Sequence, residues 1–358
     1  MGNPIRVGVI GAGFIGRVHL DQFRKQPDVR LVGVTDLDRS LADKAAASYG
    51  VERVFANGNE LIDSSDVDVV VVGVPNQHHK DFAVRTLKKG KDLLLEKPMA
   101  LNVKEAVEIA KVRKETGSLL MIDHQMRYTW PFRQAIEQVK AGELGKIYNA
   151  KTGWWRLKGI PGWGSWFTRS DESGGGPMID IGVHMLDIAI WLMGSPKPVE
   201  VFGSTYAEFG PKKIGTGTWG TPQWDGKYDV EDLATALIRF DNGATLSLEV
   251  SWAVHTDSDN ASFVHLMGSE GGASIYGNRV KYTGQKFGRA YSVEVPQPAD
   301  VPDPRSLLTT HFLDCVRERK TPLIGAESGV VNMAIIDAIY KSAKSGKSVS
   351  IDCKALGV

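Results

Sequence analysis

Three glycines near the amino terminus have the spacing of a turn that can hold the phosphates of a dinucleotide. Gly11, Gly13 and Gly16 follow a β-branched run and open a helical pattern. The first glycine of such a turn allows a tight bend, the second lets the backbone approach a pyrophosphate, and the third lets the helix pack closely on the strand. Free N–H groups at the start of the helix favour an anion. We therefore predict that this turn binds a dinucleotide; the alternative is a purely structural bend.

The choice between NAD and NADP depends on the end of the next predicted strand. Asp36 lies where a carboxylate accepts hydrogen bonds from the ribose hydroxyls of NAD and repels a 2′-phosphate. Arg39 could instead accommodate that phosphate, unless Asp38 caps the following helix and Arg39 is solvated. We expect NAD, with NADP the less favoured cofactor.

A lysine follows a third apolar run, in the segment Glu96-Lys97-Pro98. The carboxyl ends of strands line the ligand crevice of a doubly wound sheet, so Lys97 is a candidate to meet cofactor and substrate. Pro98 restricts Lys97 to an extended backbone and allows a cis bond. A surface lysine that ends a strand fits the residues equally well.

Two polar residues interrupt a strongly apolar helical pattern after a run of glycines. Asp180 and His184 are four apart, which places them on one face of a helix. A histidine there can take a proton from a hydroxyl near neutral pH. The alternatives are a core histidine bonded to a backbone carbonyl, with Asp180 as a cap, and a pairing of His184 with Asp187.

The elements that must position these residues change in kind along the chain. Alternating strands and helices up to about residue 124 predict a Rossmann-type, doubly wound α/β domain over 1–124. The expected strands are Ile5–Ile10, Arg30–Thr35, Val67–Val72, Asp92–Leu95 and Leu119–Ile122, and the expected helices are Ile15–Lys25, Ser40–Tyr49, His79–Lys89 and Val103–Thr116.

Residues 125–358 predict an α+β domain with a large, mostly antiparallel open sheet for substrate binding and oligomerisation. Its expected strands are Val199–Phe209, Leu233–Phe240, Ala244–Trp252, Ser262–Met267, Ala273–Tyr276, Arg279–Thr283 and Ala290–Val295. Helices are expected at Phe132–Lys140, Ile179–Met193, Ser306–Arg319 and Ser328–Ser345. The last of these could pack back on the first domain.

Composition excludes several classes of protein. The chain has 358 residues with a formal net charge of +1, whereas a nucleic-acid-binding protein usually has a strong basic excess. No apolar run reaches the roughly eighteen residues of a membrane span. Cys315 and Cys353 are too few for a disulfide framework or zinc cluster, which favours a reducing cytoplasm.

Taken in order, these motifs strongly resemble the Gfo/Idh/MocA family of oxidoreductases, whose namesakes include glucose–fructose oxidoreductase and inositol 2-dehydrogenase. The resemblance rests on the glycine turn, on Glu96-Lys97-Pro98, and on Asp180 and His184 in an Asp-x-Gly-x-His segment. The segment with Pro75, Asn76 and His79 is similar to another element of that family. The resemblance covers nearly the whole chain.

The resemblance implies an NAD(P)-dependent dehydrogenase that acts on a secondary alcohol of a sugar, glycoside or inositol-like cyclitol. His184 would take the hydroxyl proton, Lys97 would hydrogen-bond the same oxygen, and Asp180 would bond substrate or pair with Lys97. A cation and a base suffice for this chemistry, so no metal is expected. The expected cofactor contacts are Gly11, Gly13, Phe14, Ile15, Gly16, Asp36, Pro75, Asn76, His79, Glu96 and Lys97.

The expected substrate contacts add aromatic faces, which stack on sugar rings, and an arginine that donates to hydroxyls. They are Lys97, Tyr128, Trp154, Arg156, Trp166, Asp180 and His184. The alternative for the Trp163–Trp166 loop is that its tryptophans fill the core or a subunit contact. A homodimer or homotetramer through the second domain's sheet is also implied.

Two rival functions remain open. Some relatives use bound NAD to oxidise a sugar transiently and then eliminate a substituent, so an NAD-dependent glycosidase or lyase is one alternative. The other is a non-catalytic dinucleotide-binding module, which has no need of Lys97, Asp180 and His184.

Overall fold

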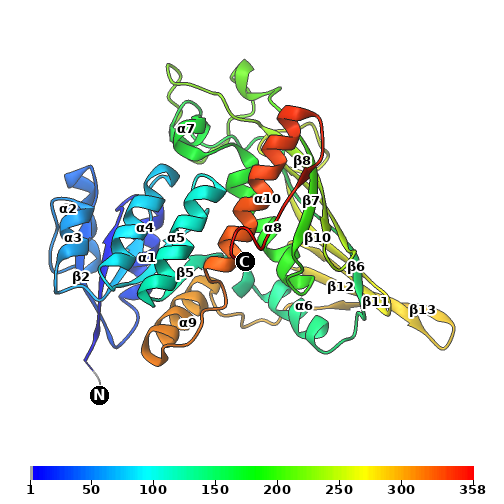
Figure 1. The fold of residues 1–358 in the computed structure, drawn as a ribbon, viewed down its shortest axis with the longest axis horizontal. Coiled ribbons are helices and arrows are strands. Elements are labelled where there is room, and N and C mark those ends of the chain that lie inside the picture. The colour runs from blue at the N-terminus through cyan, green and yellow to red at the C-terminus, as the bar shows by residue number, and fades with distance from the viewer. Residues whose placement is uncertain (1–2) are drawn as a thin grey trace. The chain divides into compact units, whose positions relative to one another are not determined.

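A five-stranded parallel sheet organises the first part of the chain in the computed structural model, which describes residues 3–358 (Figure 1). In the order β2-β1-β3-β4-β5, the strands are β1 (Ile5–Ile10), β2 (Val29–Thr35), β3 (Val69–Val72), β4 (Asp92–Glu96) and β5 (Leu120–Asp123). The connecting helices are α1 (Phe14–Phe23), α2 (Arg39–Tyr49), α3 (Gly58–Asp63), α4 (His79–Lys88) and α5 (Val103–Thr116). The predicted doubly wound fold is confirmed, and α3 is an element that the prediction lacked.

Burial on both faces explains the composition of this sheet. All four valines of β3 have no exposed surface, as a parallel strand covered by helices on both sides requires. The strand order reverses between β1 and β3. In doubly wound sheets, ligands bind outside the carboxyl ends of the strands at such a reversal.

A late segment of the chain belongs to the same compact unit as this sheet. Unit 1 comprises the chain up to Gln125 together with Asp303–Val330, and unit 2 comprises Met126–Pro302 and Val331–Val358. The division by sequence had assigned 303–330 to the second domain. Helix α9 (Pro304–Glu318) joins unit 1 because Phe312 packs edge-on against Phe23 of α1, at 6.3 Å between ring centroids. The guanidinium of Arg317 also bonds both carboxylate oxygens of Asp28.

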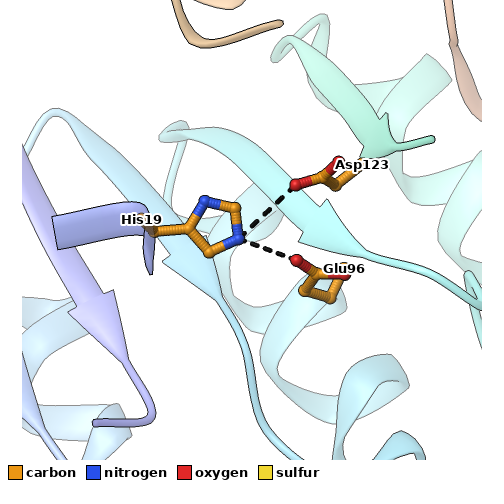
Figure 2. Close-up of side chains that lie close together, drawn as sticks. All are labelled: His19, Glu96 and Asp123. Atoms are coloured by element: carbon orange, nitrogen blue, oxygen red, sulfur yellow. Dashed lines mark hydrogen bonds and ion pairs between the residues drawn. The ribbon is translucent and has the colours of Figure 1, made fainter. Parts of the chain in front are cut away.

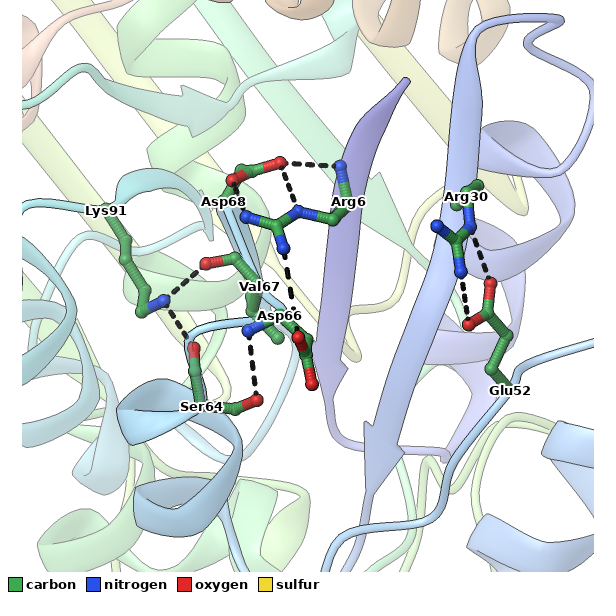
Figure 3. A network of polar contacts seen from close by, with 8 residues as sticks. All are labelled: Arg6, Arg30, Glu52, Ser64, Asp66, Val67, Asp68 and Lys91. Carbon is green, nitrogen blue, oxygen red and sulfur yellow. Dashed lines mark hydrogen bonds and ion pairs between the residues drawn. The ribbon is translucent and has the colours of Figure 1, made fainter. Parts of the chain in front are cut away.

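Charged side chains fasten the amino-terminal ends of the parallel strands (Figure 3). Arg6 of β1 donates to both carboxylate oxygens of Asp68, at 3.0 and 2.7 Å, just before β3 begins. The ammonium of Lys91, just before β4, donates to the carbonyl oxygens of Ser64 and Val67. This edge of the sheet is therefore held together by charged side chains and backbone carbonyl groups of the same unit.

Unit 2 is built on a nine-stranded sheet in the order β13-β12-β11-β10-β6-β9-β8-β7-β14. The strands are β6 (Ile147–Arg156), β7 (Pro198–Tyr206), β8 (Leu233–Phe240), β9 (Thr245–Ser251), β10 (Asn260–Gly268), β11 (Gly271–Tyr276), β12 (Arg279–Lys286), β13 (Arg289–Val295) and β14 (Val349–Ser350). Among the described residues, every neighbouring pair is antiparallel except β6 with β9. The predicted mostly antiparallel sheet is confirmed, whereas the central parallel pair was not foreseen.

One face of this sheet is covered by helices and the other is open. The helices of unit 2 are α6 (Trp130–Lys140), the single turn α7 (Ser170–Ser173), α8 (Val183–Leu192) and most of α10 (Ala326–Ser345), with short 3₁₀ turns at Gln125–Tyr128, Trp166–Thr168 and Gly210–Lys212. Helices α8 and α10 lie along the covered face (Figure 1), where Gly203 of β7 approaches Ile339 of α10. On the open face, Phe202 of β7 lies opposite Leu237 of β8, and both are about half exposed.

The predicted helix Ile179–Met193 is a π-helical turn followed by an α-helix. Residues Met178–Gly182 form the π turn, and α8 continues from Val183. A buried ion pair holds α8, because Arg127 donates to both carboxylate oxygens of Asp187 at 2.7 Å. Asn332 of α10 donates to the same carboxylate at 3.2 Å.

None of the helices in the described part of the chain has both the length and the apolar character that crossing a membrane requires.

We expect Asp187→Ala to lower the free energy of unfolding by about 3–5 kcal/mol, because it leaves the buried guanidinium of Arg127 without its carboxylate. Urea denaturation followed by circular dichroism measures the change. The matched control is Glu52→Gln, which breaks the exposed bidentate pair with Arg30 (Figure 3) and should cost much less because water and salt screen that pair. Equal losses in the two variants would contradict a role for the Arg127–Asp187 pair in holding α8.

Candidate functional site

The glycine turn after β1 has the geometry that a dinucleotide requires. Gly11 has a φ of +100°, and a Cβ there would lie 2.2 Å from the carbonyl oxygen of Gly73. A Cβ on Gly16 would lie 1.8 Å from the carbonyl oxygen of Gly11, so the helix can approach the strand only with glycine. At Gly13 a Cβ would meet no heavy atom of the described residues within 4 Å. The second glycine therefore faces open space at the start of α1, where a pyrophosphate would bind the helix N–H groups.

Asp36, at the end of β2, is held beside this turn. Its carboxylate accepts hydrogen bonds from the backbone N–H groups of Ala12 at 2.7 Å and Asp38 at 2.9 Å. The side chain of Asp38 caps α2 by accepting from the N–H of Ser40. Arg39 forms an exposed ion pair with Asp43. The turn and Asp36 thus fit the phosphates and ribose of a dinucleotide, and Arg39 has a carboxylate partner on its own helix.

The predicted cofactor residues after β3 and β4 are joined by a buried histidine. Asn76 opens a short 3₁₀ turn at Asn76–His78, just after Pro75. The ring nitrogens of His79 lie 2.9 Å from the carbonyl oxygen of Val74 and 2.7 Å from that of Pro98. Burial lowers the pKa of His79, which favours the neutral imidazole. The Lys97–Pro98 peptide bond is cis. Direct cofactor contacts by Pro75, Asn76, His79 and Lys97 stay predictions.

The segment with Asp180 and His184 is anchored at its start by a buried carboxylate. Glu231 accepts hydrogen bonds from the N–H groups of Gly176 at 2.9 Å and Met178 at 3.0 Å, and from the hydroxyl of Tyr340 at 3.0 Å. Burial raises the pKa of Glu231, although these bonds oppose the shift. The N–H groups at the start of the π turn therefore have a fixed acceptor, which sets the position of the turn that carries Asp180 and leads to His184.

Two residues at the carboxyl ends of the central strands interact with Asp180, one by a hydrogen bond and one through its charge. Because β6 and β9 are parallel, their carboxyl ends lie side by side, with Trp155 paired to Ser251. The next residues are Arg156 and Trp252. The indole N–H of the fully buried Trp252 donates to Asp180 at 3.0 Å, and the charge of Asp180 also acts on Arg156. Burial lowers the pKa of Arg156, and the charge of Asp180 opposes this shift. Asp180 is thus oriented by an aromatic donor that the sequence did not single out.

The remaining predicted substrate residues occupy varied environments in unit 2. Tyr128 is buried, while Trp154 is partly exposed, bonds Asn260 through its indole N–H and lies 4.7 Å beneath the guanidinium of Arg156. Trp166 is partly exposed and lies against Phe167. Trp163 is buried and stacks against the rings of Trp224 and Tyr228, so this tryptophan of the loop belongs to the core. Direct substrate contact by the others stays a prediction.

A buried polar cluster beside Lys97 was missed from the sequence (Figure 2). The Nε2 atom of His19, on α1, lies 2.8 Å from a carboxylate oxygen of Glu96 and 3.6 Å from one of Asp123. Arg305 of α9 lies 3.8 Å from Asp123. Burial and the charge of Glu96 raise the pKa of Asp123 to about 7, whereas the hydrogen bond and charge of His19 outweigh burial and lower the pKa of Glu96. A polar residue on the inner face of α1 and an acid ending β5 were the available signals.

Comparison with known proteins covers both units. Residues 5–124 match the model of the oxidoreductase family with an NAD-binding Rossmann fold, Gfo/Idh/MocA, and residues 136–351 match the model of that family's C-terminal α/β domain. The chain is 32% identical over 352 residues to the D-glucoside 3-dehydrogenase of Escherichia coli (strain K12), covering 98% of each chain. It is 26% identical to the NAD-dependent scyllo-inositol 2-dehydrogenase of Bacillus subtilis (strain 168), covering 99% of this chain and 98% of the relative.

Solved structures show the same fold. Levoglucosan dehydrogenase in complex with NADH superposes with a TM-score of 0.86 at 22% identity, covering 98% of this chain and all of the other. Because both family models match and together span most of the sequence, the chain belongs to the Gfo/Idh/MocA family of oxidoreductases and is an NAD-binding dehydrogenase.

Proposed function

We propose that this dehydrogenase oxidises a secondary alcohol on the ring of a sugar, glycoside or inositol-like cyclitol, with Lys97, Asp180 and His184 acting on that alcohol. The observation that carries the proposal is the pair Asp180 and His184 on a helix anchored by Glu231, with Asp180 oriented by the indole of Trp252. Burying polar side chains in so apolar a helix costs free energy unless they find hydrogen-bond partners, and a bound substrate can supply such partners. The names of the relatives, which act on glucosides and inositol, support the substrate class.

Each residue has a distinct part in the proposed reaction. Bound NAD supplies the acceptor for the hydride that leaves the alcohol carbon. His184 takes the hydroxyl proton, because an imidazole can exchange a proton near neutral pH. Lys97 donates a hydrogen bond to the same oxygen and stabilises the negative charge that develops there. Asp180, held by Trp252, orients the substrate or Lys97.

The side chains around Asp180 also support the proposed substrate class. Arg156, stacked over Trp154, offers several N–H donors to ring hydroxyls beside an aromatic face. A polyhydroxylated ring has both features, polar edges and apolar C–H faces. We therefore expect a cyclic polyol or glycoside to be preferred over an open-chain alcohol.

We expect the purified protein to form NADH with at least one member of a panel of inositols, aldoses and glycosides. Lys97→Met and His184→Ala should each lower kcat by about 10²–10⁴-fold while NADH still binds, because each removes a group that acts on the reacting oxygen. Trp252→Phe removes the indole N–H and leaves a smaller aromatic ring, without removing a group that acts on the reacting oxygen, so it should lower kcat less than either. Absorbance at the NADH band gives turnover, and NADH fluorescence gives binding.

Three results of this assay would overturn the proposal. The first is near-normal turnover in Lys97→Met or His184→Ala. The second is release of a substituent from a glycoside with no net NADH, which would assign the chain to the glycosidases or lyases that oxidise the sugar transiently. The third is NADH binding with no reaction of any member of the panel by either route, which would contradict the proposed substrate class.

We also propose that NAD is preferred over NADP, because the Asp36 carboxylate is held where the adenine ribose would lie. Asp36→Ala should raise the KM for NAD by about 10–100-fold, since a hydrogen bond to a charged group is worth about 1.5–3 kcal/mol. The same change should raise the ratio of NADP to NAD activity. Arg39→Ala is the matched control and should leave the ratio unchanged, because Arg39 pairs with Asp43. A native preference for NADP would contradict the assignment to Asp36.

A homo-oligomer through the open face of the unit 2 sheet completes the proposal. Phe202 and Leu237 lie side by side on that face, and exposed apolar patches of this kind are typical of subunit contacts. We expect a dimer or tetramer by light scattering after size exclusion, and Leu237→Glu should shift it toward the monomer because it places a charge in the contact. A native monomer, or a variant with an unchanged mass, would refute this assembly.

A further inference from the structure

The cluster of His19, Glu96, Asp123 and Arg305 has no part in the reaction as proposed above, yet it adjoins Lys97. Glu96 and Asp123 are direct partners at the carboxyl ends of the neighbouring parallel strands β4 and β5. Two buried carboxylates in this arrangement repel each other unless a proton or a cation lies between them. The structure places one group of this kind beside each carboxylate: the imidazole of His19 lies against Glu96, and the guanidinium of Arg305 lies near Asp123.

The contacts of the cluster connect three elements. His19 belongs to α1, the helix that begins at the glycine turn, and bonds Glu96 at 2.8 Å. Glu96 is the last residue of β4 and directly precedes Lys97, whose N–H lies 3.3 Å from the Glu96 carboxylate. Arg305 reaches Asp123 from the first turn of α9. One buried carboxylate therefore joins the helix at the turn to the strand end that carries Lys97.

We propose that His19, Asp123 and Arg305 are positioning residues, which act through Glu96 to fix the strand end that carries Lys97 relative to the helix at the glycine turn. The inference rests on the proposed role of Lys97. The arrangement holds while Asp123 keeps its proton, because ionised Asp123 would repel Glu96 across the pair of strands. The charged or titratable groups facing the two carboxylates are His19 from α1, Lys97 after β4, Arg305 from α9 and, toward Glu96, His79 from α4.

A metal ion is the competing occupant of this cluster. One ligand atom each from His19, Glu96 and Asp123 lies within 4.8 Å of the others, which is a separation that an ion could bridge. The direct 2.8 Å contact between His19 and Glu96, and the nearby guanidinium of Arg305, favour the proton instead. An ion would have to break that contact and would bind beside a positive charge.

Substitutions at His19 separate positioning from folding. His19→Leu removes the donor to Glu96, whereas His19→Gln places an amide nitrogen near the position of Nε2. We expect His19→Leu to lower kcat about tenfold or more with little change in the KM for NAD, and His19→Gln to restore most of it. Asp92→Asn is the matched control, because Asp92 is a buried carboxylate at the other end of β4, bonded to Arg319 and the N–H of Leu119. It should affect stability and leave kcat unchanged.

The pH profile tests the proton on Asp123. With a pKa of about 7, wild-type Asp123 loses its proton as the pH rises through neutrality. Asp123→Asn cannot ionise, so the ratio of its kcat to that of the wild type should rise between pH 6 and pH 8.5, by roughly threefold or more, if repulsion displaces the strand end. A ratio that is flat with pH would overturn the proposal.

A measurement without substrate keeps this inference separate from the proposed function. Because the folded pKa of Asp123 is raised, the folded state holds a proton that the unfolded chain has lost between about pH 4 and pH 7. The contribution of Asp123 to wild-type stability falls across that window, so the Tm of Asp123→Asn minus that of the wild type should rise from pH 5 to pH 8. Hydrogen–deuterium exchange of the peptide spanning residues 92–100 should increase in His19→Leu and return toward the wild-type level in His19→Gln.

The outcomes can be told apart. If the wild type turns over no substrate, the proposed function fails, and the cluster is judged by Tm and exchange alone. A flat Tm difference, or unchanged exchange in His19→Leu, overturns the positioning network even in an active enzyme. Stoichiometric zinc in the wild-type protein that His19→Leu loses would also overturn it and make the cluster a metal site.

Discussion

The structure of unit 1 depends on burying a parallel sheet on both faces. The valines of β3 have no exposed surface. A polar side chain in the middle of this sheet would therefore be buried away from water, which costs free energy. Polar groups therefore gather at the strand ends. The amino edge is closed by ion pairs such as Arg6 with Asp68, while the carboxyl edge carries the glycine turn, Asp36 and the two carboxylates Glu96 and Asp123. The buried middle of the sheet excludes polar groups, so the residues proposed to meet the cofactor lie where the strands end.

Much of this edge could be predicted because its signals are local in sequence. The spacing of Gly11, Gly13 and Gly16 follows from contacts within one turn, and the backbone positions confirm a steric reason for Gly11 and for Gly16, while Gly13 faces open space. The same holds for the fold of unit 1, since alternating strands and helices leave few topologies. His19 and Asp123 escaped notice because their meaning arises only when α1, β4 and β5 come together. A polar residue on a helix marks a candidate position, but it does not identify the partners that it will meet.

Unit 2 shows the same limit more strongly. Alternation predicted seven of its nine strands with approximate bounds, whereas β6 and β14 were missed. No local pattern announces that β6 and β9 run parallel in an otherwise antiparallel sheet. That pairing is what brings Arg156 and Trp252 together near Asp180. The π turn at Met178–Gly182 was also invisible, since a spacing of four residues fits an α-helix equally well. Glu231, distant in sequence, accepts from the backbone at its start.

The return of residues 303–330 to unit 1 bears on how the chain folds during synthesis. Phe23 of α1 packs on Phe312, and Asp28 on Arg317, so the first unit lacks these partners until the ribosome has made α9. By then eight of the nine strands of the unit 2 sheet have been made, and these eight can pair while the nucleotide-binding unit still exposes part of its core. A nascent chain stalled before α9 would present that apolar surface to chaperones, and a fragment cut at the family's domain boundary would retain it permanently.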